Sequence, residues 1–499
     1  MTPLVSIDQP PALIQPAPPS HSIMIPGLPV KTALDDVRGE PVEPVQAVQQ
    51  SRPNVTPNQG PLVQSNGEPA PSVPDTPLPA LPQHGPALAG TPAGKPSASP
   101  HLLGTWFGIR PKLEEIGITP SAAYFFQPAV NVNGGKGSEL ALYGQFVAGA
   151  TVDLDKVAGL EGGVFQVQFS NRHGKNLNQD EQLGLLQNPQ GVIGAGEIWR
   201  LSQLYYRQTI GKVELQVGRN SVGADFGSSP CFFEGLYWCG NTIGHIASGY
   251  WFNPPVSVWG ARVKVGDKLG YTMAGIYENN PRNLNVDHGI YLGFKGRTGV
   301  LLPIERGFTV KLGGDPKLAG VYTIGFWYDT SRSTNLVKDS DGNFAAISGE
   351  PFGSQRGRYG AYVVARQQLR AGDADGRGGI VLQANAVFTD PRTTQIQNIF
   401  QAGATYTGLF AARPTDEIGF AIGRTRVNHN VTELQQALNG LNIDPTQPPR
   451  SEYAMELDYS INAAPGLSIR PNVQWYLDPG GRSQKENIVV VGASIFLTL

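Results

Sequence analysis

The sequence predicts an all-β fold: a 16-stranded antiparallel transmembrane β-barrel behind a short helical segment and a proline-rich tail. First, 62 Gly and 42 Pro in 499 residues are too many for a helical protein. Second, no stretch approaches the roughly 18 consecutive apolar residues of a transmembrane helix, so a membrane crossing would need a closed barrel. Third, from Thr119 onward, segments of alternating polarity are separated by clusters of Gly, Pro, Asn and Asp, a pattern typical of strands and turns.

Residues 1–100 form the first predicted region, a disordered tail. They hold more than half of the prolines and no Phe, Trp or Tyr. Such a segment cannot bury enough apolar surface to offset its ordering entropy, so we expect disorder with polyproline II character. Residues 1–24 show no basic region followed by an apolar stretch, and therefore no visible signal peptide. Because export requires one, we expect it to be trimmed or to lie upstream.

Residues 101–118 form the second region, predicted to be helical. Apolar side chains recur there at helical spacing, namely Leu102, Leu103, Trp106, Ile109, Leu113 and Ile116. Proline interrupts helices, so we expect one or two short helices broken near Pro111.

Residues 119–499 form the third region, the barrel. Its strands are expected at 119–132, 139–154, 162–171, 196–208, 212–219, 256–265, 269–277, 299–311, 319–329, 358–370, 378–389, 396–408, 416–426, 450–462, 466–477 and 486–499. An even number allows the last antiparallel strand to close on the first. Long and short links alternate approximately, and the link after the thirteenth strand should contain a short helix starting at Thr432.

The clearest strand, Glu452–Asn462, has apolar side chains on one face and three carboxylates, Glu452, Glu456 and Asp458, on the other. Unpaired charge is costly in a packed core, so this face predicts a water-filled lumen. In the next strand Pro471 lacks an N–H, which predicts a bulge or a lost ladder bond. Aromatic residues on outward faces predict interfacial girdles, namely Tyr322, Phe326, Tyr328, Tyr453, Tyr459 and Trp475.

Cysteines and overall charge limit the classes of function. Cys231 and Cys239 lie close together in turn-rich sequence, which favours a small disulfide-closed loop over two unpaired thiols. The net charge of −2 gives no basic footprint for nucleic acid. We find no GxSxG or HExxH motif, so we expect no enzyme, catalytic residue, metal or cofactor. The aromatic-free tail cannot be the folded plug of a gated receptor, and no 40–45-residue repeat supports a propeller.

Residues 102–499 resemble the carbohydrate-selective porins of the OprB family. The landmarks are LLGTWFGIRPKLEEIGIT from Leu102, NRHGKNL from Asn171, LSQLYYRQ from Leu201, GRNSVGADFGSSP from Gly218, LAGVYTIGFWYDT from Leu318 and RPNVQWYLDPGG from Arg470. The resemblance implies a monomeric barrel in the outer membrane of a Gram-negative bacterium, with a periplasmic N-terminal helix and an inward-folded loop. It also implies passive diffusion of monosaccharides, with outer-membrane lipid and the barrel-assembly machinery as partners. The alternatives are a general non-selective porin, or a barrel with a structural or enzymatic role.

A channel for small neutral sugars should offer hydrogen-bonding groups without one dominant sign of charge. Alternation and position make eight residues candidates for lining the pore or touching sugar: Arg172, His173, Glu197, Gln203, Tyr205, Arg207, Glu214 and Asp225. Arg172, His173 and Asp225 are expected to project toward a constriction. The alternative for Arg172 is a structural one, bracing a loop through hydrogen bonds to carbonyls.

Overall fold

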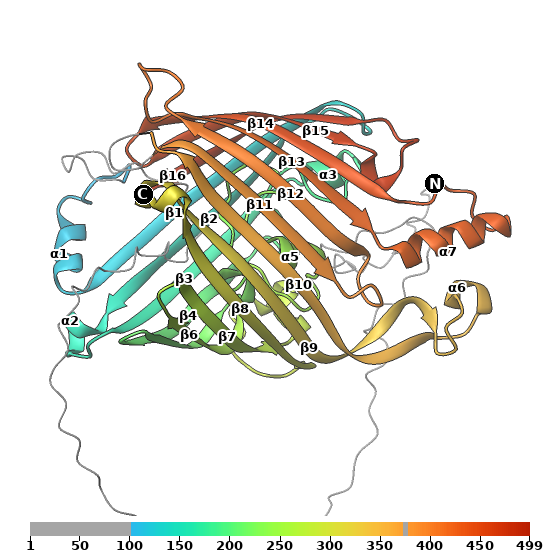
Figure 1. Cartoon of the computed structure of the whole chain (residues 1–499), viewed down its shortest axis with the longest axis horizontal. Coiled ribbons are helices and arrows are strands. Elements are labelled where there is room, and N and C mark those ends of the chain that lie inside the picture. Colours follow the sequence, from blue (N-terminus) through green and yellow to red (C-terminus); the bar gives the residue numbers. More distant parts are fainter. Residues whose placement is uncertain (1–100, 373–377) are drawn as a thin grey trace, which may run out of the picture. The chain divides into compact units, whose positions relative to one another are not determined.

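The computed structural model describes residues 101–372 and 378–499; the predicted tail, residues 1–100, lies outside them. The described chain forms sixteen antiparallel strands in one closed barrel (Figure 1). Each strand pairs with its neighbours in sequence, and β1 pairs with β16. The predicted fold class is therefore confirmed.

The elements have these bounds. The strands are β1 Ile118–Asn133, β2 Ala141–Asp153, β3 Gly163–Gly174, β4 Trp199–Ile210, β5 Val213–Asn220, β6 Val258–Gly266, β7 Gly270–Asn279, β8 Gly299–Lys311, β9 Ala319–Asp339, β10 Phe352–Arg370, β11 Gly379–Thr389, β12 Ile396–Thr407, β13 Glu417–Val427, β14 Ser451–Ala464, β15 Leu467–Leu477 and β16 Ile488–Thr498. The helices are α1 Ile109–Glu115, α2 Leu154–Ala158, α3 Leu177–Asp180, α4 Val222–Asp225, α5 Thr242–Ile246, α6 Ala345–Ser348 and α7 His429–Gly440. Among the described residues, none of the helices combines the length and apolar character needed to cross a membrane.

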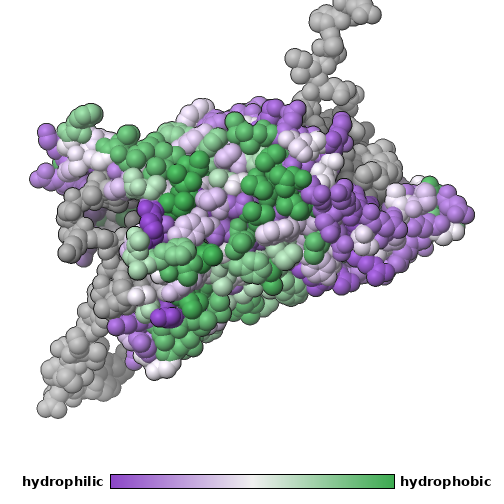
Figure 2. All heavy atoms as spheres, turned by 90° about the horizontal axis from the view of Figure 1, so that it is seen from above, coloured by the Kyte–Doolittle hydropathy of each residue, from purple (hydrophilic) through white to green (hydrophobic). Residues whose placement is uncertain are grey.

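Alternation along the strands separates an apolar outer surface from a polar inner surface. In β14, Tyr453 and Leu457 are each 43% exposed on the outside, whereas Glu452 and Glu456, which directly precede them, are fully buried on the inside. Apolar side chains form a broad band over the outer surface (Figure 2). An apolar band on the outside of a closed barrel matches the hydrocarbon layer of a membrane.

Pro471 behaves as predicted. The β14–β15 ladder pairs Asp458 with Asn472 and Ile461 with Ile469 but has no pair at Pro471. The register is the same on both sides of this gap. The proline therefore removes a ladder bond without adding a bulge.

The links alternate strictly between the two ends of the barrel. One end, here called the external end because long links are external in barrels of this kind, carries residues 134–140, 175–198, 221–257, 280–298, 340–351, 390–395, 428–450 and 478–487. The opposite, periplasmic end carries mostly shorter links. Figure 1 shows α6 and α7 at the external end and α1 at the periplasmic end.

Three local predictions differ from the structure. Helix α1 continues through Pro111, because this proline lies in the first turn, where its N–H is not needed. Helix α7 starts at His429 rather than Thr432, because the Asn428 side chain accepts a hydrogen bond from the Asn430 N–H and caps the helix. Strands β9 and β10 also extend further than predicted, and carry α6 at their tip.

The helical segment closes the seam between the first and last strands. The Leu102 N–H donates to the Thr498 carbonyl at 2.8 Å. The buried Arg110 guanidinium donates to the carbonyls of Leu499, at 2.6 Å, and Pro120, at 3.2 Å. One cation therefore holds the start of β1 and the end of β16 together.

Candidate functional site

The link between β5 and β6, residues 221–257, folds into the barrel. Six of its aromatic side chains are at most 2% exposed, namely Phe226, Phe233, Tyr237, Tyr250, Trp251 and Phe252. We call this segment the lumen loop. It is the inward-folded loop expected from the resemblance.

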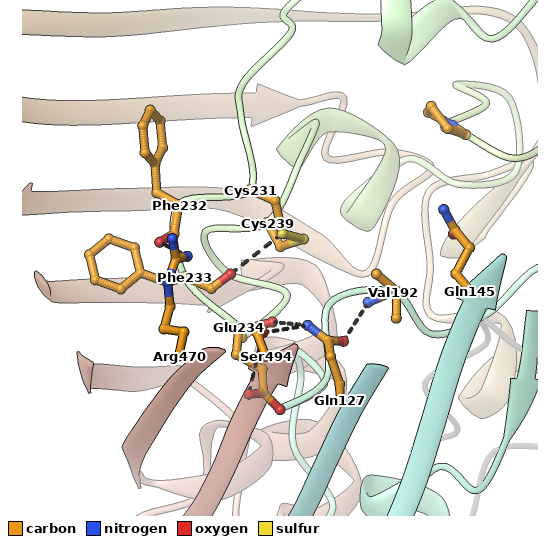
Figure 3. Close-up of a disulfide and its surroundings, with 12 residues drawn as sticks. Gln127, Gln145, Val192, Cys231, Phe232, Phe233, Glu234, Cys239, Arg470 and Ser494 are labelled. Carbon is orange, nitrogen blue, oxygen red and sulfur yellow. Dashed lines mark hydrogen bonds between the residues drawn. A yellow bond between two sulfur atoms is a disulfide. The ribbon is translucent and has the colours of Figure 1, made fainter. Parts of the chain in front are cut away.

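The lumen loop is fixed against β14 and β15 around a disulfide between Cys231 and Cys239. The Glu456 carboxylate accepts the backbone N–H groups of Glu234, at 2.7 Å, and Gly235, at 2.8 Å. The Arg470 guanidinium donates to the Phe232 carbonyl (Figure 3). Charge-assisted hydrogen bonds of this kind are roughly twice as strong as neutral ones, so they hold the loop firmly to this wall.

The sequence analysis predicts that the acidic face of β14 lines open water. In the structure this face is covered by protein. Glu452 and Glu456 are fully buried and Asp458 is 4% exposed, all beneath the lumen loop. Backbone N–H groups from distant links replace the lost water: Glu452 accepts from Leu186 at 2.7 Å and Gly480 at 2.9 Å. Alternation predicted the correct face. It carried no information about a loop that arrives from more than 200 residues away.

A second network fixes the start of the lumen loop to β5, β6 and β7. Asp225 is buried, and its carboxylate pairs with Arg262 at 2.9 Å and accepts from the Tyr277 hydroxyl at 2.8 Å. Arg262 also pairs with Glu214 at 2.6 Å, and Arg207 lies 4.0 Å from Glu214. Asp225 therefore faces the wall and not the constriction, and its charge is neutralised there.

Between the lumen loop and the wall formed by β1 to β4 lies a cavity of about 180 Å³, called the inner cavity. Its polar lining is mainly uncharged and includes Gln145, Gln168, Ser170, Ser202, Gln203 and Asn253. Rings of Phe125, Trp251 and Phe252 line it as well. The cavity equals the liquid volume of about six water molecules, which suits one small polar ligand.

Arg172 reaches this cavity and joins four segments. Its guanidinium donates to Gln145 of β2 at 2.6 Å, to the Ile193 and Gly194 carbonyls at 2.9 and 3.2 Å, and to the Pro254 carbonyl at 3.2 Å. The carbonyl-bracing geometry weighed in the sequence analysis is the one present. Arg172 thereby fixes the shape of the cavity as well as lining it.

The other predicted residues are spread over the barrel. Gln203 lines the inner cavity, and the buried Tyr205 lies on the inner face. Glu197 precedes β4 in an exposed position at the external end. His173 does not project toward the constriction: its imidazole lies 2.9 Å from the Tyr124 hydroxyl and stacks on that ring. Because its neighbour Arg172 points inward, alternation puts His173 on the outer face.

A larger cavity, of about 800 Å³, lies at the external end and is called the outer cavity. Charges of both signs surround it, with Lys136 and Lys175 facing Glu139, Glu181 and Glu197. Ile193 lines both cavities, so the segment held by Arg172 separates them.

Sequence reasoning missed Arg262 and Glu234. Alternation along Val258–Gly266 puts Arg262 on the same inward face as Val258, so the sequence held that signal. Glu234 had no such signal, because its partners, Asn472 and Ser494, lie on β15 and β16.

Within 101–372 and 378–499, no three His, Cys, Asp or Glu side chains gather as a metal site would require.

A closed barrel with an apolar outer band and an inward loop that narrows its lumen defines a porin. Residues 137–498 match the family described as "Carbohydrate-selective porin, OprB family". The chain belongs to this family, whose members reside in the outer membrane, and both the family and the barrel fold point to a channel.

Individual relatives agree with this assignment. Porin B of Pseudomonas aeruginosa is 35% identical over 410 residues, covering 79% of this chain and 90% of that protein. A putative porin, QuiX, of Acinetobacter baylyi is 30% identical over 424 residues, covering 79% and 92%. The high-pH structure of Pseudomonas putida OprB is 34% identical, with a TM-score of 0.77 and coverage of 81% and 99%.

Proposed function

We propose that this porin passes neutral sugars of monosaccharide size, one at a time, from the outer cavity past Ile193 into the inner cavity. The observation that carries the proposal is the lining of the inner cavity. Amide and hydroxyl groups of Gln145, Gln168 and Ser202 match the hydroxyls of a sugar, and the rings of Trp251 and Phe252 match its C–H faces.

The balance of charge also favours neutral solutes. Asp225 and Glu214 neutralise Arg262, and carbonyls occupy the N–H groups of Arg172. Arg172 keeps its positive charge, but its bound N–H groups leave few donors for an incoming anion, and the rest of the lining of the inner cavity holds no Asp, Glu or Lys. The alternative is a general porin in which size alone decides passage.

Liposome swelling with glucose and maltose, combined with planar-bilayer conductance in KCl, tests the proposal. Gln168→Leu removes one amide from the inner cavity, while Gln484→Leu changes an exposed glutamine of an external link. We expect Gln168→Leu to slow glucose flux several-fold relative to KCl conductance, and Gln484→Leu to leave the ratio unchanged. Equal changes in sugar flux and conductance would favour the general porin.

A further inference from the structure

Three arginines cluster on the outer surface at the external end of β11 to β13: Arg392, Arg424 and Arg426. In β13, Phe420 and Ile422 are 47% and 49% exposed on the outside, whereas Ala421 and Thr425 are at most 1% exposed on the inside. The same alternation places Arg424 and Arg426 on the outside. We call these three residues the rim arginines.

Aromatic rings fix the depth of the rim arginines. The Arg424 guanidinium lies 6.0 Å from the centre of the Phe400 ring, and Arg424 pairs across strands with Tyr453. The Arg392 guanidinium lies 5.5 Å from the Tyr359 ring. Because outward aromatic rings mark the boundary between hydrocarbon and headgroups, these guanidinium groups lie at the depth of the headgroups. Figure 2 shows hydrophilic residues beyond the apolar band at this end.

The protein leaves most of this charge uncompensated. Arg392 pairs with Asp390 at 2.7 Å. Among the ion pairs of the described residues, none includes Arg424 or Arg426; Arg424 donates to the Ser451 hydroxyl at 3.2 Å. Successive residues on one face of a strand are roughly 7 Å apart. The positive charges of Arg424 and Arg426 therefore repel each other, most strongly where water is scarce.

Other strands at this end differ. Phe146, His173 and Trp199 occupy the outward positions of β2, β3 and β4 near their external ends, and Phe146 and Trp199 stack edge to face. Strands β2–β4 therefore carry no such excess of cations near their external ends, whereas Arg332 and Arg356, both exposed and paired across β9 and β10, add further cations at this end.

We propose that the rim arginines bind phosphate groups of phosphorylated lipids in the external leaflet. Guanidinium groups bind phosphate through paired N–H···O bonds, and two of them on one strand face can hold one phosphate from both sides. Arg392 reaches a second phosphate of the same headgroup or a neighbouring lipid. This lipid site is separate from the sugar path, because it lies on the other face of the wall.

The test uses the whole porin in detergent micelles and a diphosphorylated lipid A as the probe, with the bound lipid counted by native mass spectrometry. Arg424→Gln/Arg426→Gln removes two charges from the rim, and Lys311→Gln/Lys317→Gln removes two exposed charges from the periplasmic end. Each cation near a lipid surface contributes roughly 1 kcal/mol to lipid binding, and about 1.4 kcal/mol corresponds to a tenfold change in affinity. The rim variant, which lacks two cations, should therefore bind the lipid about 30-fold more weakly. The control variant should bind like the unchanged protein, and Arg424→Lys/Arg426→Lys should lie between them.

Three results would overturn the proposal. Unchanged lipid binding by Arg424→Gln/Arg426→Gln would show that the rim arginines hold no lipid. An equal loss in the lysine control would show that net charge, not this cluster, attracts the lipid. Displacement of the lipid by an equal concentration of inorganic phosphate would assign the cluster to free phosphate. Heat-modifiable migration of every variant on gels verifies that the barrel is folded.

Discussion

Replacing Glu456 with Gln tests whether this buried carboxylate fixes the lumen loop. The carboxylate accepts two backbone N–H groups, at 2.7 and 2.8 Å, from the disulfide-closed part of the loop. Gln offers one acceptor oxygen, and its NH₂ group faces the second N–H. One charge-assisted hydrogen bond, about 1.5–3 kcal/mol, is lost, and one buried donor stays unpaired at a further 1–3 kcal/mol. Relief of the buried charge offsets part of this sum, so we expect the docked loop to lose about 3 kcal/mol.

A loosened loop should let larger solutes pass. In liposome swelling, we expect Glu456→Gln to raise the maltose rate relative to glucose, and single-channel recordings should show more open-channel noise. Glu433→Gln is the matched control, because Glu433 is an exposed carboxylate of α7 and lines neither cavity. If Glu456→Gln and Glu433→Gln leave the maltose-to-glucose ratio and the noise equally unchanged, the carboxylate does not hold the loop and the reasoning fails.

Three further predictions concern other contacts. Arg172→Ala should change sugar flux at normal yield of folded barrel, because it frees Ile193, Gly194 and Pro254 at the inner cavity; flux equal to that of the unchanged protein would remove Arg172 from the constriction. Cys231→Ser/Cys239→Ser should lower the free energy of unfolding by about 2–3 kcal/mol, from the entropy of a short loop; denaturant titration measures this, and an identical midpoint contradicts it. A hydrogen bond from Arg306 lowers the pKa of Asp267, in the exposed β6–β7 turn, to about 2. Ionised Asp267 therefore favours the folded turn above its unfolded pKa, and the effect is lost as pH falls through about 2. Arg306→Gln should raise the NMR titration midpoint of Asp267, and an unshifted midpoint would exclude this cause.

The sequence predicts well those features that depend on short-range patterns. The period-two alternation of β14 and the missing N–H of Pro471 are both visible along one strand, and both predictions are confirmed. Capping is equally local, but two residues of this link can start a helix, and the structure has the cap at Asn428 where the sequence analysis expects a start at Thr432. The count of sixteen strands follows from turn residues between polar–apolar repeats, although the ends of β9 and β10 extend beyond the predicted positions.

The candidate site depends on contacts between distant segments, which a periodic pattern does not encode. The sequence around Glu456 does not indicate that residues 231–239 cover this side chain. Asp225 is a similar case, because its partner Arg262 lies 37 residues away on another strand. Alternation assigns a side chain to the inner surface; only the path of the lumen loop decides whether that side chain meets water, protein or sugar.

The seam between β1 and β16 determines how this protein must acquire its structure. Register partners such as Ala123 and Thr498 are separated by nearly the whole described chain. Bringing these two ends of the chain together costs conformational entropy before the hydrogen bonds between β1 and β16 can form. Contacts between residues so far apart in sequence make folding slow. Until then two strand edges stay open to pairing with other chains. The Arg110 contacts with Pro120 and Leu499 form only when both edges meet, so this arginine slows reopening rather than speeding closure.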